Sequence, residues 1–539
     1  MSDPVGHNPE DVGGFEGLLP ETDAAEVRPP LRPRGLLSNA MWSSMALVSA
    51  GLVSFVTIGI VRRAIGTNAY GLYLILAMIG GFLVLLDLGL GEATLKYVAQ
   101  YHSRNDMVGV NRVVGATLMI YTAGGLIGGA VIIVAAPWIV LLFKLSPEEA
   151  DQATTLLRIA GVAFILTPVV GALRTIPEAA HRFDVGSKFR IVMELVRGVV
   201  MIVVVKLGYG LFGLIVWMVG YQVLNLVGLL IVVVVLLPGI RPWPHPTRRG
   251  MREVFGYGIF SFVNEIVGTL SVYIDRLILA MFFGTAAVAY LGVPRQLLTQ
   301  AAGVYSAAGR PLFPKFSAME PGPGMQHLFL FSTWCMLCLS LVLFVPTMVI
   351  MPEFMRLWQG AEFAEHSSDV AIVIASVMSL QGAFIPYYGL LKGTGRIHWL
   401  TFVYLASTGL GVVAALVLVP LFGVMGGGYR LWVTIGAGYV VFFWVSRRLF
   451  PEVRLHTLGL RVLLPSLLVS LVVGGVFWFA WRALDPHGWL AIIVAWLIMA
   501  AVLLGVLCAV DRVIGGPDGP AAELYRAVRA WTARRRGRT

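Results

Sequence analysis

Charged side chains interrupt several long apolar stretches of this chain, and these residues are its candidates for chemistry. They are six arginines and six carboxylates: Arg158, Arg174, Arg197, Arg276, Arg295 and Arg430, with Asp87, Glu92, Glu178, Glu194, Glu265 and Asp275. A guanidinium stays charged and donates paired hydrogen bonds, which suits a phosphate or another anion. A carboxylate in apolar surroundings can carry a proton or help to bind sodium. The residue types therefore predict anion binding, cation coupling or both.

Helical spacing divides these residues into local pairs and unpaired charges. Three pairs stand three or four positions apart and are expected to neutralise one another: Arg174 with Glu178, Glu194 with Arg197, and Glu92 with Lys96. From the remainder we select Arg276, Arg295 and Arg430 as candidate substrate ligands, and Glu265, Asp275 and Asp87 as candidates for ion coupling or for lining a cavity. A hydrogen-bonded acid at a helix interface is the alternative role for Glu265.

Asp275 and Arg276 are adjacent, so on a helix they point about 100° apart and make a poor mutual pair. A helical turn is expected near Thr285, ten residues after Asp275 and ten before Arg295, which places both at a depth of about 15 Å. We therefore predict an ion pair between Asp275 and Arg295 that leaves Arg276 available to an anion. Pro294 is expected to kink or break the helix that carries Arg295.

Small and polar residues share one face of the helix that precedes this turn. They are Ser261, Asn264, Glu265, Gly268, Ser271 and Asp275. Such a stripe does not suit contact with lipid. It indicates the wall of an aqueous cavity, with a helix interface joined by small and polar residues as the alternative.

The composition places the chain in a membrane. Of its 539 residues, 58% are hydrophobic and only 13% are charged, which is more apolar surface than one water-soluble core can bury. Continuous apolar runs recur at the length of roughly 20 residues that a helical crossing needs. We predict about fourteen transmembrane helices, at about 36–61, 70–95, 113–142, 152–178, 189–206, 210–237, 254–283, 286–309, 325–351, 368–391, 398–419, 424–446, 460–483 and 488–510.

Lysine and arginine are distributed unevenly between the predicted loops, with a large excess on the side of the amino terminus. The positive-inside bias therefore places both termini in the cytoplasm. These basic loops also account for the net charge of +11, and they do so better than nucleic-acid binding. The predicted outer loops are short, the longest at about 352–367, so the chain lacks the large outer loop that a polysaccharide polymerase or ligase would need.

Short motifs recur at a spacing of about 214 residues and predict an internal repeat. The matching pairs are Gly66-Thr67 and Gly284-Thr285, Gly210 to Gly213 and Gly423 to Gly426, and Arg182 and Arg396. Two six-helix bundles in one orientation follow, with two further helices. The expected divisions are a disordered cytoplasmic tail 1–35, an amino-terminal lobe 36–237, a cytoplasmic loop 238–253, a carboxy-terminal lobe 254–450, two additional helices 460–510, and a basic cytoplasmic tail 511–539.

Several motifs of this chain resemble those of the polysaccharide exporters, the Wzx-type flippases of lipid-linked oligosaccharides within the multidrug/oligosaccharidyl-lipid/polysaccharide exporter superfamily. They are Gly66-Thr-Asn-Ala-Tyr-Gly-Leu-Tyr73, Asp87-Leu-Gly-Leu-Gly91, Lys96-Tyr-Val98, Asp275-Arg-Leu-Ile-Leu279 and Pro420-Leu-Phe-Gly-Val-Met-Gly426. The resemblance implies an all-α, V-shaped transporter in a bacterial inner membrane. It also implies movement of an undecaprenyl-pyrophosphate-linked glycan by alternating access, for O-antigen, capsule or exopolysaccharide assembly beside a polymerase and chain-length proteins.

Other functions fit the sequence less well. A lipid II flippase and a cation-coupled drug exporter of the same superfamily are the nearest alternatives. Cys335 and Cys338 have the spacing of a metal or redox motif, but they lie within an apolar run without polar ligands, so we expect helix packing, no metal and no cofactor. Gly208 to Gly213 matches a dinucleotide motif without the strand that such a site requires.

Overall fold

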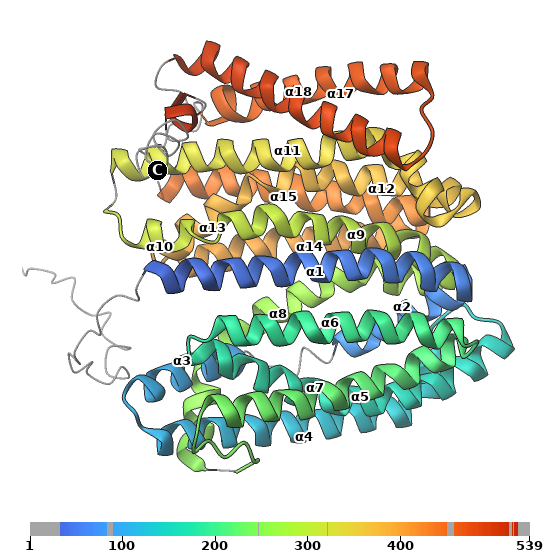
Figure 1. Cartoon of the computed structure of the whole chain (residues 1–539), viewed down its shortest axis with the longest axis vertical. Helices are drawn as coiled ribbons and strands as arrows, with labels where there is room; N and C mark the ends of the chain where they lie inside the picture. Colours follow the sequence, from blue (N-terminus) through green and yellow to red (C-terminus); the bar gives the residue numbers. More distant parts are fainter. Residues whose placement is uncertain are drawn as a thin grey trace, which may run out of the picture.

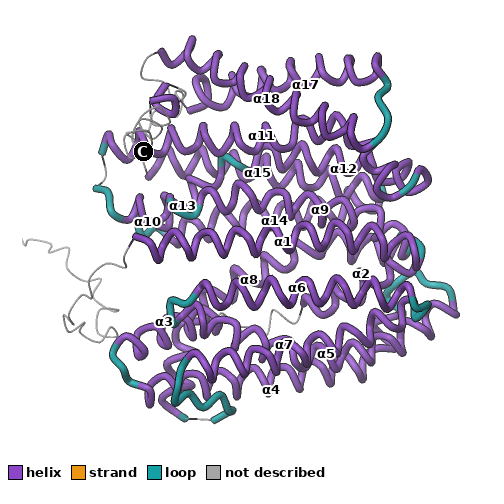
Figure 2. The backbone as a smooth tube through the Cα atoms, viewed as in Figure 1, coloured by secondary structure: helices purple, strands orange, loops and turns teal. Residues whose placement is uncertain are grey.

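A computed structural model of the chain describes residues 33–82, 90–245, 247–320, 322–449, 458–516, 520 and 522–526. All the regular structure in these residues is helical (Figure 2). The helices are α1 (Pro33–Ile65), α2 (Thr67–Phe82), α3 (Leu90–Ser103), α4 (Met107–Val140), α5 (Pro147–Ala179), α6 (Phe183–Lys206), α7 (Gly210–Leu236), α8 (Arg248–Phe282), α9 (Thr285–Gly309), α10 (Leu312–Ser317), α11 (Pro323–Gln359), α12 (Ala361–Gln381), α13 (Phe384–Gly393), α14 (Ile397–Phe422), α15 (Val424–Leu449), the π-helical segment Leu458–Leu463, α17 (Leu464–Leu484) and α18 (Trp489–Gly515).

Ten helices within the described residues are long and apolar enough to cross a membrane: α1, α4, α5, α7, α11, α12, α14, α15, α17 and α18. Helices α6, α8 and α9 run alongside them (Figure 1). The all-helical membrane fold is thus confirmed, whereas the count of about fourteen crossings stays a prediction. Both predicted tails, 1–35 and 511–539, lie largely outside the described residues.

The helices pack in two groups joined by three connecting helices. Helices α3 to α7 contact one another, and helices α9 to α18 contact one another. Helix α1 packs against α6 and α9, α2 packs against α5 and α9, and α8 contacts α3 and α4 as well as α14. Figure 1 shows the long helices running side by side, with α1 and α18 reaching the same end of the bundle.

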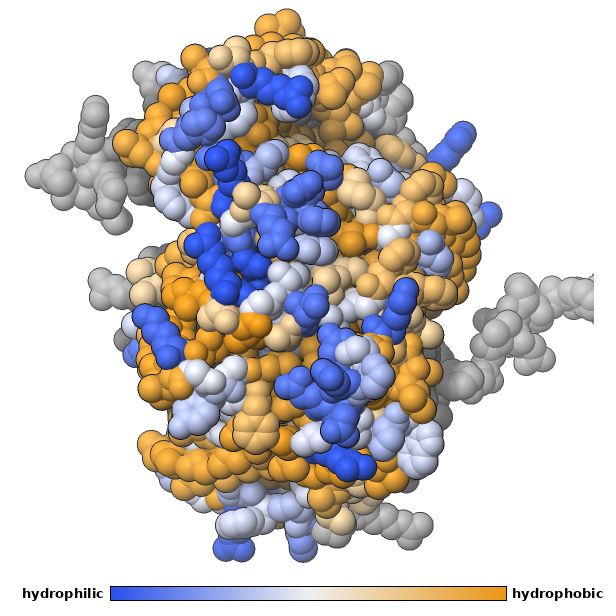
Figure 3. Space-filling model, turned by 90° about the vertical axis from the view of Figure 1, so that its right-hand side faces the viewer, coloured by the Kyte–Doolittle hydropathy of each residue, from blue (hydrophilic) through white to orange (hydrophobic). Residues whose placement is uncertain are grey.

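Large apolar side chains cover the outer sides of the bundle. Trp138 on α4, Val235 on α7, Leu421 on α14 and Leu490 on α18 are all well exposed. At the end of the bundle where α1 terminates, hydrophilic residues gather over the centre and hydrophobic ones surround them (Figure 3). Apolar sides with polar ends are the arrangement that a membrane-spanning bundle requires.

The structure corrects three details of the sequence interpretation. The predicted outer loop at about 352–367 is wrong, because α11 continues to Gln359 and only Gly360 separates it from α12. Gly360 has a φ of 96°, which glycine adopts without strain, so two long helices can meet in one residue. The predicted span 368–391 is divided between α12 and α13. Helix α9 continues through Pro294, so the predicted break is absent, while a kink at this residue stays a prediction.

Candidate functional site

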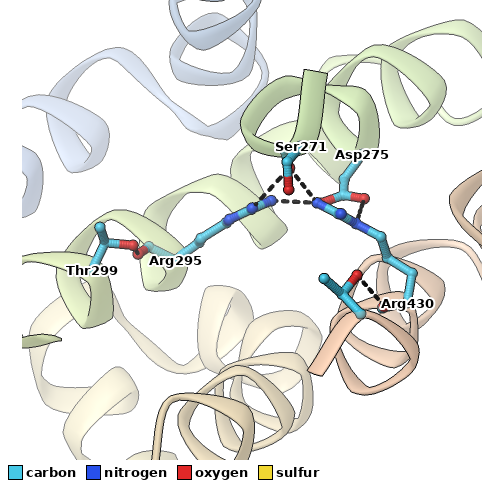
Figure 4. Close-up of polar contacts among 6 residues, drawn as sticks. Ser271, Asp275, Arg295, Thr299 and Arg430 are labelled. Atoms are coloured by element: carbon cyan, nitrogen blue, oxygen red, sulfur yellow. Dashed lines mark hydrogen bonds and ion pairs between the residues drawn. The ribbon is translucent and has the colours of Figure 1, made fainter. Parts of the chain in front are cut away.

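Three charged side chains form a buried cluster where α8, α9 and α15 meet (Figure 4). Arg295 Nη1 donates to Asp275 Oδ2 at 2.5 Å, which confirms the pair predicted from the hairpin. Arg430 donates to both carboxylate oxygens of Asp275, with Nη2 to Oδ2 at 2.5 Å. Both arginines also donate to the backbone carbonyl of Ser271, at 3.3 Å from Arg295 and 2.5 Å from Arg430. Each guanidinium therefore binds a carboxylate and a carbonyl of the same helical turn.

The cluster is almost completely excluded from solvent. The side chains of Asp275 and Arg430 are 0% exposed and that of Arg295 is 12% exposed. Two guanidiniums face one carboxylate, and Nη1 of Arg430 is buried without a hydrogen-bond partner. A charge at the centre of a bilayer costs about 2.5–3.5 kcal/mol on insertion scales. The Asp275 carboxylate and the Ser271 carbonyl therefore offset a cost that two isolated arginines would carry in full.

The ends of the three helices bring these residues to similar depths. Asp275 lies seven residues before the end of α8, Arg295 ten after the start of α9, and Arg430 six after the start of α15. At 1.5 Å per residue these positions are about 10, 15 and 9 Å below one end of the bundle.

Glycines at the start of α15 allow its close packing beside Arg430. A Cβ on Gly427 would lie 2.9 Å from Leu291 of α9, and one on Gly428 would lie 2.9 Å from Val373 of α12. Small residues of this kind permit helix backbones to approach within a membrane. They place Arg430 within reach of Asp275.

Arg276 lies apart from the cluster, as the 100° step along α8 predicts. Its guanidinium carbon stands 6.0 Å from the ring centroid of Tyr273, and its Nε is buried without a hydrogen-bond partner. A Cβ on Gly292 of α9 would lie 3.7 Å from that Nε, so the glycine makes room for the side chain. Arg276 is thus the one of the three predicted substrate ligands whose guanidinium makes no contact with a carboxylate within the described residues.

Two predicted coupling residues cannot be placed. Asp87 lies outside the described residues, and Glu265 lies on α8 in a stretch where only the backbone is described. Cys335 and Cys338 lie on α11, where Cys338 is part of a hydrophobic core cluster and Cys335 packs against it.

A charged cavity of about 290 Å³ lies toward the end of the bundle where α1 begins. It is bounded by α1, α5, α6 and α7 and by the residue that follows α9. The charged residues that line it are Arg174, Arg190, Arg310, Glu178 and Glu194. Sequence reasoning treated Arg190 and Arg310 as topology signals, because nothing in the sequence relates residues 120 positions apart. They reach one cavity only in the folded bundle, where α1 packs against both α6 and α9.

The two local pairs predicted around this cavity have different outcomes. Glu194 and Arg197 form an ion pair at 2.6 Å, as predicted. Arg174 and Glu178 are exposed to the cavity and, within the described residues, make no ion pair with each other, so that prediction is wrong. Both residues lie within the last two turns of α5, with Pro177 between them. Arg174 therefore remains available to an anion.

At the opposite end of the bundle, α1 is bound to the junction of α11 and α12. Arg62 Nε donates to Gln359 Oε1 at 2.5 Å, and a second nitrogen of Arg62 donates to the Gln359 carbonyl. Trp358 donates to the carbonyl of Phe55 and its ring stacks on that of Phe55 at 5.2 Å. We call these four residues the α1–α11 junction. These contacts hold α1 and α11 together at this end of the bundle.

A bundle with apolar sides, a charged internal cavity and a buried ionic cluster is the architecture of a membrane transporter. Residues 36–320 match the family of polysaccharide biosynthesis proteins. The chain belongs to this family, which confirms the resemblance seen in its motifs. A protein of Shigella flexneri that bears the name "Putative O-antigen transporter" is 21% identical over 386 residues, which cover 67% of this chain and 87% of that protein.

Solved structures share the fold. The lipid II flippase MurJ in an inward closed conformation has a TM-score of 0.71 at 11% identity, covering 88% of this chain and 99% of that one. A multidrug-resistance MATE transporter in an inward-facing conformation has a TM-score of 0.57 at 14% identity, covering 78% of this chain and 95% of that one. These likenesses show a shared fold, and the family match identifies the chain as a multi-pass membrane protein of the polysaccharide biosynthesis family.

Proposed function

We propose that the protein flips an undecaprenyl-pyrophosphate-linked oligosaccharide across the bacterial inner membrane for O-antigen, capsule or exopolysaccharide assembly. The observation that carries this proposal is the charged cavity in which Arg174, Arg190 and Arg310 meet. Family membership and the O-antigen transporter relative support the substrate class. In this proposal both termini are cytoplasmic, so the cavity faces the leaflet on which the lipid-linked glycan is made. A polymerase and chain-length proteins would then use the product on the other side.

The arrangement of arginines suits a pyrophosphate headgroup. Arg174, Arg190 and Arg310 come from three separate segments and are exposed to the cavity. Planar guanidiniums bind phosphate oxygens with two hydrogen bonds each and remain charged in a low dielectric. We assign the first contact with the headgroup to these residues, and a later contact to Arg276, whose guanidinium is not held by a carboxylate.

Arg295 and Arg430 act differently in this proposal, because Asp275 holds both of them. The cluster supplies a fixed net positive charge that draws an anion inward, and it meets the headgroup only if the pair with Asp275 opens. Glu265 and Asp87 remain our candidates for ion coupling. A lipid II flippase is the second candidate function, favoured by the fold match that covers 99% of the solved MurJ chain.

Reconstitution tests both functions in one assay. The purified protein is placed in liposomes with fluorescent undecaprenyl-pyrophosphate oligosaccharide, and the lipid that reaches the outer leaflet is bleached by an impermeant reductant. We expect faster bleaching than in protein-free liposomes, and slower bleaching with Arg174→Ala. Parallel liposomes carry fluorescent lipid II or a cationic dye. The proposal would be overturned if the protein did not change the bleaching of the oligosaccharide lipid but did move one of the other two probes. The probe that moved would then identify the substrate class.

A further inference from the structure

A second cavity, of about 270 Å³, lies within the carboxy-terminal group of helices and is distinct from the charged cavity. Helices α8, α9, α12, α13, α14 and α15 bound it. Its lining combines aromatic rings with hydroxyl and amide groups, among them Tyr305, Gln381, Phe384, Tyr388, Tyr404 and Thr408. None of the described residues that line it carries a formal charge. The cavity therefore selects for a neutral and polar occupant.

Several polar groups at this cavity have no protein partner. Tyr305 Oη donates to Gln381 Oε1 at 3.2 Å, which fixes the Gln381 amide. Within the described residues, the amide nitrogen of Gln381 and the hydroxyls of Tyr388 and Thr408 make no hydrogen bond, although Thr408 is only 3% exposed. An unsatisfied polar group away from water costs free energy, above all inside a membrane. These three groups are therefore placed to bind a polar ligand.

The remaining lining excludes most other occupants. A phosphate would need cations, but the nearest guanidiniums, those of Arg295 and Arg430, are already bonded to the Ser271 carbonyl and to Asp275. A metal cation would need carboxylates, and the lining provides none among the described residues. An acyl chain would leave the hydroxyl and amide groups unsatisfied. A pyranose ring has apolar C–H faces and a rim of hydroxyls, and it matches both parts of the lining.

Aromatic rings form part of the lining and pack against one another. The rings of Phe384 and Tyr388 stack with their centroids 6.0 Å apart. The ring centroid of Tyr439 lies 4.6 Å from that of Phe384. Ligand sites typically combine an aromatic lining with a few polar groups that fix orientation, in volumes of roughly 300–1,000 Å³. A cavity of about 270 Å³ is at the lower limit of that range, so it accommodates one ring and not a whole oligosaccharide.

We propose that this cavity is a saccharide subsite that holds one neutral pyranose ring of the transported glycan. The proposal rests on the proposed function and adds a specificity to it. A ring with a carboxylate or a phosphate would be disfavoured, because the described lining residues offer no counter-charge. The subsite binds the glycan and the charged cavity binds the headgroup, so the two sites recognise different parts of one substrate.

Two substitutions on α15 provide a matched test. A Cβ on Gly438 would point toward Phe384, at 3.2 Å from its ring, whereas a Cβ on Gly436 would meet nothing within 4 Å. Gly438→Leu therefore fills the cavity, and Gly436→Leu adds the same side chain to an open surface of the same helix. Thr408→Val is a third variant, which removes one hydroxyl and keeps the volume should Gly438→Leu fail to fold.

Binding is measured without transport, by saturation-transfer NMR on the purified full-length protein with a panel of neutral methyl pyranosides. We expect transfer to at least one pyranoside from the wild type and from Gly436→Leu, and none from Gly438→Leu. Thr408→Val should weaken binding roughly fivefold, the effect of one lost hydrogen bond of about 1 kcal/mol. Transfer that is absent from the wild type, or that is equal in all variants, would overturn the subsite.

Flipping then relates the subsite to the substrate. We expect Gly438→Leu to slow the flipping of the glycan-bearing lipid and to leave that of sugar-free undecaprenyl pyrophosphate unchanged. An equal decrease in the flipping rates of both lipids would count against a role of this cavity in binding the glycan. A wild-type protein that flips neither lipid would refute the proposed function, while the NMR experiment would still decide whether the cavity binds saccharides.

Discussion

Asp275 and Arg430 form a fully buried ion pair although 155 residues separate them in the chain. Arg295 binds the same carboxylate, so one acid on α8 holds an arginine from α9 and another from α15. The carboxylate is therefore the centre of the cluster: it pairs with both arginines, whereas among the described residues each arginine pairs only with it.

This asymmetry predicts unequal effects of neutralising each partner. Asp275→Asn leaves two buried guanidiniums without a carboxylate, whereas Arg430→Gln leaves one guanidinium facing one carboxylate. Loss of a partner from a buried pair costs roughly 3–5 kcal/mol, so we expect Asp275→Asn to reach that range and Arg430→Gln to cost less. Thermal unfolding in detergent measures both variants. Asp184→Asn, at a more exposed pair with Arg182, serves as the control, and a larger effect of Arg430→Gln would contradict the arrangement.

Arg276 should separate transport from stability. Since its guanidinium makes no ion pair with the cluster, Arg276→Ala is expected to slow flipping while changing the unfolding temperature less than Arg295→Ala does. Both variants should insert in the membrane, and both should reduce surface glycan in cells. Normal glycan in cells that carry either variant would remove these arginines from the substrate path.

The backbones of α2 and α9 approach each other closely at Gly71. A Cβ on Gly71 would lie 1.9 Å from the carbonyl oxygen of Thr285, so Gly71→Ala must move one backbone. We expect a destabilisation of about 1–3 kcal/mol, as for other overpacked sites. Gly171→Ala on α5 is the control, because its Cβ would meet nothing within 4 Å. That control should be neutral or stabilising, since alanine favours a helix interior. Equal unfolding temperatures for the two variants would show that α2 and α9 do not pack this closely.

The α1–α11 junction should determine how readily one end of the bundle opens. Arg62→Ala removes the donors to the side chain and carbonyl of Gln359, so we expect faster hydrogen exchange at the junction of α11 and α12. Arg356→Ala, which removes only an exposed pair with Glu353 at 3.5 Å, should leave that exchange nearly unchanged. Identical exchange in both variants would mean that Arg62 does not stabilise the closed end.

Sequence reasoning was most successful where the information was local. The apolar runs predicted the membrane helices, and a count of ten residues on each side of a turn predicted the pair between Asp275 and Arg295. The same reasoning failed at residues 352–367, because polar residues at the end of a long helix look like a loop. It also paired Arg174 with Glu178, whereas both side chains are exposed to the charged cavity without contacting each other.

Composition, hydrophobic periodicity and charge spacing by themselves determined the all-helical membrane class and which charged residues to consider, and short sequence motifs carried the family resemblance. Those features depend on neighbours along the chain, within a few helical turns. Only the tertiary structure decided that Arg430 shares Asp275 with Arg295, that Arg190 and Arg310 line one cavity, and that a neutral polar cavity lies beside the cluster. These arrangements depend on which helices pack together, and that choice comes from side-chain fit between segments more than 100 residues apart.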